Sequence, residues 1–213
     1  METSTVAVPS EVASTRDVIL DAAERLFAGR GFAAVSMRQI AAEAGLRNQA
    51  SLYHHFRNKR ALYEAVLARG LSDIGSMVPS QRTQSLEELN ANLDRLLDYL
   101  ARHPHLARLI QRAALDDSRY LESAVTGLLR PFYAQSSRAL AGAEQIWSEK
   151  EIPHLGAGLY LIIFGYFANA PLLGVMLDED PLSEPAVQRQ RRFVKEAVAR
   201  LLGLAGSSRP RPD

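Results

Sequence analysis

The most informative stretch of the chain is residues 36–59, which read SMRQIAAEAGLRNQASLYHHFRNK. A helix is expected to begin after Ser36, because its hydroxyl can accept a backbone N–H while Gln39, three positions later, reaches back in a capping box. Gly45 marks a turn, since glycine adopts at little cost the left-handed backbone conformation that ends a helix. The stretch therefore predicts two short helices joined at Gly45.

The second of these helices is expected to present hydrogen-bonding side chains away from the core. Anchoring contacts are expected from Leu46, Ala50, Leu52 and Tyr53, and the side chains expected to point outward are Arg47, Asn48, Gln49 and Ser51. Arginine, asparagine and glutamine make bidentate hydrogen bonds to base edges in the major groove. We therefore predict that these four residues contact bases or the groove. An ordinary helical hairpin with a solvated polar face has the same spacing and remains an alternative.

Basic and polar residues follow the turn motif immediately. Asn58 is placed to cap a further helix, whose free N–H groups and Lys59 could both bind a phosphate. The residues expected to contact phosphates are Arg38, Tyr53, His54, His55 and Lys59. Residues 15–70 carry nine Arg and Lys against five Asp and Glu, a net charge of +4, whereas the whole chain carries +1. This modest positive charge supports a nucleic-acid partner only because it coincides with the turn motif.

Over residues 15 to about 70, the chain resembles the tetracycline-repressor (TetR) family of one-component bacterial transcription regulators. The resemblance rests on three segments, TRDVILDAAERLFAGRGF, SMRQIAAEAGL and SLYHHFRNKRALYEAVL. It implies a dimeric DNA-binding regulator, a repressor that releases a palindromic double-stranded operator when a small molecule binds its C-terminal part. Six residues separate Gly45 from Leu52 where the common family pattern has five. This departure leaves open which of residues 47–50 face the bases.

Helical patterning extends along the whole chain. Helices are expected from residue 14 or 15 to Gly31 and then near 58–75, 85–102, 104–115 and 118–140. No segment alternates with the two-residue period of a strand. The predicted architecture is all-α. It comprises a flexible tail over 1–14, a three-helix helix-turn-helix domain over 15–60, a larger helical ligand-binding and dimerisation domain over 61–203, and a flexible tail over 204–213.

The longest uncharged run covers residues 155–177 and is long enough to span a bilayer. Three acidic residues follow it, and Asn169 and Pro171 interrupt it, so a helix buried on several faces is the better interpretation. Paired with the amphipathic helix 183–202, the run resembles the two C-terminal helices through which TetR-family proteins dimerise. We therefore expect a homodimer through helices near 155–177 and 183–202, and no membrane partner.

A pocket for an unidentified small-molecule effector is expected in the C-terminal helices. Its candidate wall consists of leucine and aromatic residues, Leu93, Leu97, Tyr99, Tyr120, Phe132, Tyr133, Trp147, Tyr160 and Phe164. These residue types would suit an apolar or aromatic ligand. At helical spacing they are also typical of ordinary core packing, and this alternative remains open.

Several other functions are disfavoured by the sequence. The chain has no cysteine, which excludes disulfides, thiolate zinc sites and cysteine nucleophiles. His103 and His105 would point in different directions on a helix, and no nucleophile motif is present. We expect no catalytic site, no metal and no cofactor and, because no secretory signal is visible, a cytoplasmic location. The alternatives to a regulator are a helical ligand-carrier or protein-interaction module without sequence-specific DNA binding, and an enzyme with a helical pocket.

Overall fold

The computed structural model describes residues 14–78, 85–115, 126–127, 130–131, 134–135, 140 and 146–204. The helices in this part of the chain are α1 (Thr15–Ala34), α2 (Met37–Glu43), α3 (Gln49–His55), α4 (Lys59–Met77), α5 (Leu86–Arg102), α6 (Pro104–Leu115), α8 (Ile152–Ala168), α9 (Ala170–Leu177) and α10 (Glu184–Leu201). No strand occurs within these ranges, and the expected all-α fold is confirmed. Most of the helix expected over 118–140 lies outside the described residues.

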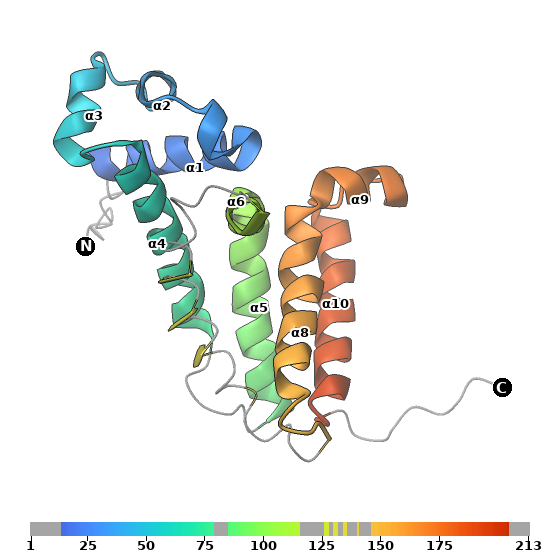
Figure 1. Ribbon diagram of the computed structural model, residues 1–213. Helices are drawn as coiled ribbons and strands as arrows, with labels where there is room; N and C mark the ends of the chain where they lie inside the picture. The colour runs from blue at the N-terminus through green and yellow to red at the C-terminus, as the bar shows by residue number, and fades with distance from the viewer. Residues whose placement is uncertain are drawn as a thin grey trace, which may run out of the picture.

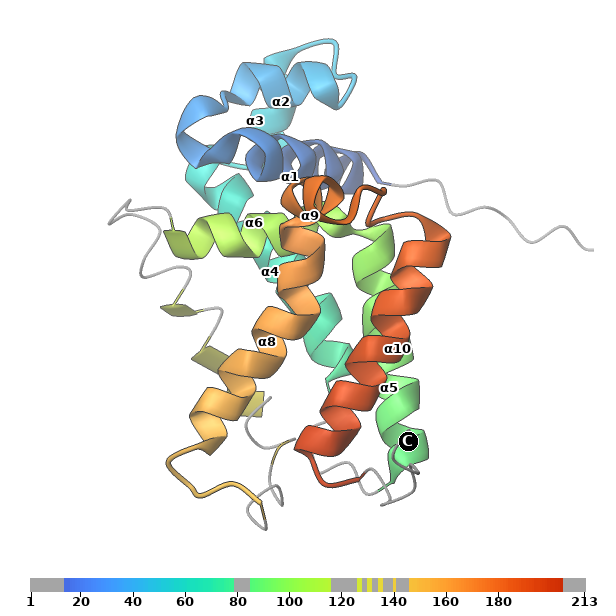
Figure 2. The same cartoon turned by 90° about the vertical axis from the view of Figure 1, so that its right-hand side faces the viewer.

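The helices α1, α2 and α3, which we call the head, lie at one end of the molecule (Figure 1). The helix α4 leads from the head into a body in which α5, α8 and α10 run alongside one another. The helix α6 lies crosswise beneath α1 and packs against it (Figure 2). Buried side chains of the head and the body form one continuous hydrophobic cluster, so the body supports the position of the head.

Side-chain caps fix where the helices of the head begin. The Ser36 hydroxyl accepts a hydrogen bond from the Gln39 backbone N–H at 3.2 Å, and Gln39 Oε1 accepts one from the Ser36 N–H at 2.8 Å. Asn58 Oδ1 accepts the Ala61 N–H at 2.8 Å and caps α4. Both expected caps are therefore confirmed. The first helix runs on to Ala34, but Gly31 inside it leaves helical geometry at φ 80° and ψ 165°.

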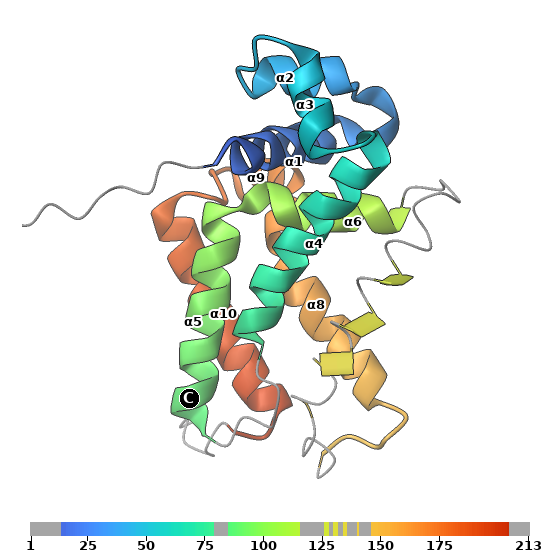
Figure 3. The ribbon, with the colours of Figure 1, turned by 90° about the vertical axis from the view of Figure 1, so that its left-hand side faces the viewer.

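One turn of α4, residues 69–73, contacts three neighbouring helices, and we call it the α4 junction (Figure 3). The Arg69 guanidinium bridges Asp21 at 2.8 Å and Glu24 at 3.1 Å, both on α1. The Tyr99 hydroxyl of α5 donates a hydrogen bond to Asp73 Oδ2 at 2.8 Å. Burial and this hydrogen bond raise the pKa of Tyr99, so the phenol remains a donor across the physiological pH range. The junction therefore connects the head to the body through polar contacts as well as through packing.

Gly70 provides the third contact of the α4 junction. A Cβ atom at this position would lie only 2.2 Å from Cδ1 of Leu106 on α6, and Leu106 is fully buried. A side chain at this position would therefore overlap with Leu106, and only glycine lets α4 and α6 approach this closely.

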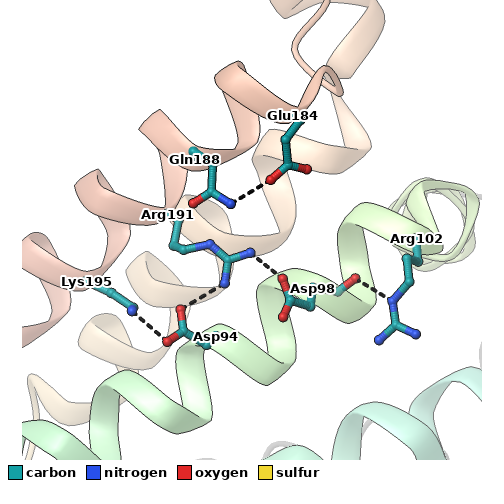
Figure 4. A network of polar contacts seen from close by, with 7 residues as sticks. All are labelled: Asp94, Asp98, Arg102, Glu184, Gln188, Arg191 and Lys195. Atoms are coloured by element: carbon teal, nitrogen blue, oxygen red, sulfur yellow. Dashed lines mark hydrogen bonds and ion pairs between the residues drawn. The ribbon is translucent and has the colours of Figure 1, made fainter.

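A network of ion pairs joins α5 to α10 (Figure 4). The Arg191 guanidinium donates to Asp94 at 2.8 Å and also pairs with Asp98, while Lys195 Nζ donates to Asp94 at 2.7 Å. Burial by itself would raise the pKa of Asp94. The hydrogen bonds and charges of Lys195 and Arg191 outweigh burial, so the pKa of Asp94 lies below its usual value. The network stabilises the packing of α5 against α10 as long as Asp94 is ionised.

We expect Arg191→Met to lower the free energy of unfolding by about 1 to 2 kcal/mol at pH 7, since its guanidinium is largely buried and its removal leaves two carboxylates with fewer partners. The pKa of Asp94 is lower in the folded than in the unfolded protein. The stabilisation is therefore present above the unfolded pKa of about 3.9 and is lost as the pH falls through the folded value. Denaturant titrations should show a constant difference from pH 7 to 5 that shrinks below about pH 4.

The exposed Lys150, which lies outside this network and outside the proposed dimer helices, provides the control for this measurement. Lys150→Met is expected to change the free energy of unfolding by less than about 0.5 kcal/mol. Equal losses from the two substitutions would contradict a stabilising role for the network.

The apolar run 155–177 does not form one buried helix, and this part of the prediction is wrong. The chain bends by 80° between α8 and α9. The physical reason is local, because Pro171 has no N–H to continue the helical hydrogen bonds and Asn169 stands at the break. In the described part of the chain, no single helix is both long and apolar enough to cross a bilayer. The bent pair α8 and α9 reaches that length and apolar composition only when its two helices are counted together.

Candidate nucleic-acid interface

The helix α3 is held on the head by two buried side chains and by the turn before it. Leu52 is fully buried and Phe56, at the end of the helix, is nearly so. Gly45 has φ 68°, and the Leu46 N–H donates to the Ala41 carbonyl at 2.9 Å, which closes the end of α2. The predicted turn at Gly45 is therefore confirmed. It leaves one side of α3 directed away from the protein, as Figure 1 shows.

The exposed side of α3 differs in part from the expectation. Ala50 and Tyr53, expected to be anchors, are exposed, and His54 and His55 are exposed as well. The difference arises because α3 begins only at Gln49. A helix turns by 100° per residue, so residues 50 and 54, each two positions from the buried Leu52, lie on nearly the opposite side of the helix. Ser51 is half-buried at the edge of this face. Gln49 is also half-buried, and its Nε2 donates to the Tyr53 hydroxyl at 3.4 Å.

Asn48 is the N-cap of α3 rather than a free polar residue of the helix. Its Oδ1 accepts the Ala50 backbone N–H at 2.8 Å, so only the amide NH₂ remains for another partner. Arg47 precedes this cap and is exposed in the turn. The cap determines the register that the sequence left open, because residues 47 and 48 lie before the helix and residues 49 and 50 lie within its first turn.

Lys59 does not extend into solvent as the predicted phosphate contact requires, and this expectation is corrected. Its Nζ donates to the carbonyls of Phe32 and Val35, both at 2.8 Å, and lies 3.5 Å from the Ala33 carbonyl. The ammonium also stands 4.4 Å from the centre of the Phe32 ring. An ammonium has three N–H donors, and these carbonyls occupy them. Burial lowers the pKa of Lys59. The residue therefore ties the start of α4 to the end of α1.

Other basic residues surround the exposed side of α3. Arg38 on α2 is exposed, as expected for a phosphate contact. Two further arginines were not predicted as contacts. Arg57 is exposed just after α3, and Arg16, also exposed, lies with its guanidinium carbon 5.3 Å from the centre of the Phe56 ring. Arg57 could have been predicted as a contact from the sequence, because it is basic and directly follows α3. No local sequence signal links Arg16 to α3.

Of the described residues predicted to line an effector pocket, all but Trp147 belong to or pack against the main hydrophobic cluster. Leu93, Leu97 and Phe164 are buried in the main cluster, and the half-buried Tyr160 ring stacks on Phe164 at 5.2 Å. Tyr99 is engaged with Asp73 in the α4 junction. The remaining described member, Trp147, packs in a separate small cluster, and its Nε1 donates to the Leu201 carbonyl at 2.7 Å. Tyr120, Phe132 and Tyr133 lie outside the described residues.

Comparisons with known proteins agree with this geometry. The family model for bacterial regulatory proteins of the tetR family matches residues 19–66. The HTH-type transcriptional repressor SCO4008 of Streptomyces coelicolor is 36% identical over 97 residues, which are 46% of this chain and 48% of that protein. The HTH-type transcriptional repressor KstR2 of Mycolicibacterium smegmatis is 48% identical over 59 residues, 28% of each chain. The chain thus spans about half or less of the length of these two relatives.

Similarity in fold extends further than similarity in sequence. The structure of the fatty acid degradation regulator FadR from Bacillus halodurans superposes with a TM-score of 0.60 at 19% identity, over 87% of this chain and 97% of that one. At this identity the likeness concerns the fold alone. The matched segment, residues 19–66, contains α2, the Gly45 turn and α3 in full. Over residues 19–66 the chain therefore matches the TetR family of bacterial regulatory proteins, and the helical fold of the described residues agrees with that match.

Proposed function

We propose that the protein is a DNA-binding transcriptional regulator, a repressor that binds a palindromic operator through α3 and releases it when a small apolar or aromatic molecule binds the C-terminal helices. The observation that carries this proposal is the exposed side of α3. This helix follows the Gly45 turn, is anchored by the buried Leu52 and Phe56, and is flanked by arginines. The named repressors among its relatives support regulation, and they do not support the ligand-carrier or interaction-module alternative. The head would comprise residues 15–60, and residues 61–203 would bind effector and partner.

The proposed contacts follow from the exposed surface of the head. Arg47, the free amide of Asn48, Gln49, Ala50 and Ser51 would face the groove. Alanine suits contact with a thymine methyl group, and arginine suits guanine. Arg38, Tyr53, His54 and His55 would contact phosphates, together with Arg16 and Arg57. Lys59 is not included, because its donors are engaged inside the head.

Arg47→Ala is expected to relax sequence preference at one base position and to cost about 1 to 3 kcal/mol of specific binding. The operator would first be selected from a random duplex pool, and affinities for single-base variants would then be measured at fixed salt. Arg95→Ala, at an exposed arginine on α5, is the matched control and should change neither affinity nor preference. An equal loss of affinity for all duplexes would contradict the base contact and indicate that Arg47 contacts a phosphate.

A homodimer would place two heads on two half-sites. The helices α8 and α10 are linked by the Gln190 side chain, whose Nε2 donates to the Ile162 carbonyl at 3.2 Å. Their outward sides carry the exposed Leu161 and Phe193, as expected for the dimer surface proposed near 155–177 and 183–202. Two half-sites one helical turn apart, about 34 Å, require the heads to keep a fixed separation. An effector that shifts α6 or α4 would change this separation.

The decisive experiment is a binding assay with the full chain. Footprinting on the selected operator at several salt concentrations should show protection of two half-sites, and candidate apolar molecules, fatty acids among them, should then be tested for release of the duplex. A coupling of about 1 to 3 kcal/mol would lower operator affinity about 5- to 150-fold. A protein that prefers no duplex over any other at moderate salt would overturn the proposal.

A further inference from the structure

Glu24 on α1 is the only charged residue that is buried in the part of the chain that the structure describes, with 8% of its surface exposed. Its partner is Arg69 of the α4 junction, whose Nη2 donates to Glu24 Oε2 at 3.1 Å. Taking two charges out of water costs about as much as their attraction returns, so a buried ion pair adds little to stability. Such a pair is well suited to hold two helices in one orientation, because its hydrogen bonds form only within a narrow range of distances and angles.

The Arg69 guanidinium fixes the rotation of α1 relative to α4. Its two terminal nitrogens bind different carboxylates, with Nη1 2.8 Å from Asp21 and Nη2 3.1 Å from Glu24. Because the guanidinium is planar and its N–H groups have fixed directions, both bonds are kept only at one relative angle of the two helices. Apolar packing has no such direction, so helices held by packing alone can rotate with little loss of buried area.

The other end of the α4 junction is bonded to the body. Asp73 follows Arg69 by four residues, about 6 Å along the helix. Its Oδ2 accepts the hydrogen bond of the Tyr99 hydroxyl of α5 at 2.8 Å. The Tyr99 ring lies against His103, with 4.5 Å between the ring centres, which limits the movement of the donor. The junction is therefore held by directional bonds to α1 of the head and to α5 of the body (Figure 3).

An operator with two half-sites makes the angle of each head consequential. One base pair added between half-sites that lie one turn apart changes their separation by about 3.4 Å and their relative rotation by about 35°. A dimer with loosely held heads could follow this change, whereas a dimer with fixed heads must lose contacts at one half-site. The stiffness of the link between head and body therefore determines how strictly the spacing is read.

We propose that Arg69 and Tyr99 are positioning residues, which fix the angle of the head on the body through the α4 junction and thereby restrict the half-site spacing that the protein accepts. The inference rests on the operator binding and the homodimer proposed above, and it adds to them the residues that select the spacing. Neither residue is among those proposed to contact DNA.

The main test replaces the ion pair by apolar side chains, Glu24→Leu combined with Arg69→Met. Such a replacement is often neutral for stability, so the unfolding temperature should stay close to that of the unsubstituted protein. Affinities are measured for the selected operator and for duplexes with one base pair added or removed between its half-sites. The unsubstituted protein should prefer one spacing. In the double variant, the ratio of the affinities for the best and the shifted spacing should fall about tenfold, since each lost hydrogen bond accounts for about two- to tenfold.

Tyr99→Phe provides a second, milder variant, because it removes only the hydroxyl and keeps the ring. It should lower the same ratio about two- to tenfold, as expected for one hydrogen bond. The control is Arg25→Gln combined with Glu43→Gln, which removes an exposed ion pair of 3.3 Å between α1 and α2. This pair lies within the head, so its removal should leave the ratio unchanged.

A further measurement needs no DNA. The chain has no cysteine, so Ala34→Cys, at an exposed position of α1, takes one spin label per subunit. Dipolar electron spin resonance of the labelled dimer then gives the distance between the two heads. We expect one narrow distance distribution for the otherwise unsubstituted protein and for the control. The distribution should be broader for the Glu24 and Arg69 double variant and for Tyr99→Phe.

The outcomes separate this inference from the proposed function. A dimer that binds the operator and whose variants keep the spacing ratio and the narrow distribution would overturn the inference and leave the regulator in place. An equal loss of affinity at all spacings would show that Arg69 and Tyr99 have only a structural role, and would also overturn it. If the double variant did not fold, Tyr99→Phe alone would decide. A protein that selects no duplex, or that remains monomeric, would overturn the proposed function and the inference together.

Discussion

Gly70→Ala is expected to destabilise the protein by about 1 to 3 kcal/mol, although alanine is the better helix former. The new Cβ would stand 2.2 Å from Cδ1 and 2.8 Å from Cδ2 of Leu106. Leu106 is fully buried, so its side chain or α6 itself would have to move to relieve the overlap. Because α1 packs on α6, we also expect the two heads to be displaced and operator affinity to fall.

Gly75 lies on the same helix and provides a matched control. A Cβ at Gly75 meets only the end of the Gln135 side chain at 3.8 Å, an ordinary contact. Gly75→Ala should therefore stabilise the protein by about 0.5 to 1 kcal/mol through the helix alone. Chemical denaturation of both variants would show changes of opposite sign. If both substitutions stabilised equally, the close approach of α4 and α6 would be refuted.

A double substitution tests the cause of the Gly70 effect. Leu106→Ala alone should cost about 2 to 5 kcal/mol, because it leaves a cavity between α4 and α6. Combined with Gly70→Ala, it removes the overlap, and the new methyl group fills part of the space. The total loss should then be smaller than the sum of the two single losses by about 1 kcal/mol or more. Additive losses would show that the destabilisation by Gly70→Ala does not arise from overlap with Leu106.

Lys59→Met should lower the free energy of unfolding by about 1 to 3 kcal/mol and leave the salt dependence of DNA binding unchanged. The ammonium donates to carbonyls at the end of α1, and methionine fills a similar volume without any donor. Affinity should fall equally for all duplexes, because the head is loosened as a whole. Thermal unfolding and binding isotherms between about 50 and 200 mM salt measure both effects.

Arg57→Gln is the comparison variant, because Arg57 is proposed to contact a phosphate and Lys59 is not. Arg57 is exposed beside α3, so its replacement should reduce the salt slope by about 0.9 without lowering stability. If Lys59→Met reduced the slope in the same way and unfolded at the temperature of the unsubstituted protein, Lys59 would be a phosphate contact after all.

The elements that could be predicted from sequence are those whose signals are local. Ser36 and Gln39 lie three positions apart, Gly45 stands at the turn itself, and Asn58 precedes the helix that it caps. The internal role of Lys59 had no such signal, because the carbonyls that bind it belong to residues 24 to 27 positions earlier. Its charge and its place after the turn motif suggested a phosphate, but the folded head brings the end of α1 within its reach.

The exposed side of α3 and the bend after α8 illustrate two different limits. Ala50 was expected to be an anchor because alanine is apolar, but its orientation depends on where Asn48 starts the helix. The bend was marked in the sequence by Asn169 and Pro171. The apolar composition of residues 155–177 nevertheless favoured one buried helix. Hydrophobicity indicates which side chains prefer to leave water, but it does not identify the surface that will cover them.

The exposure of the outer residues of α9 has an evolutionary consequence. These residues contribute little to the folding of a single chain, so they can change with a small effect on stability. If α9 belongs to the dimer surface proposed near 155–177, duplicated genes that start with identical products can diverge at α9, and mismatched surfaces would then disfavour mixed pairs. Several regulators of this kind could thus coexist in one cell, each assembling only with its own product.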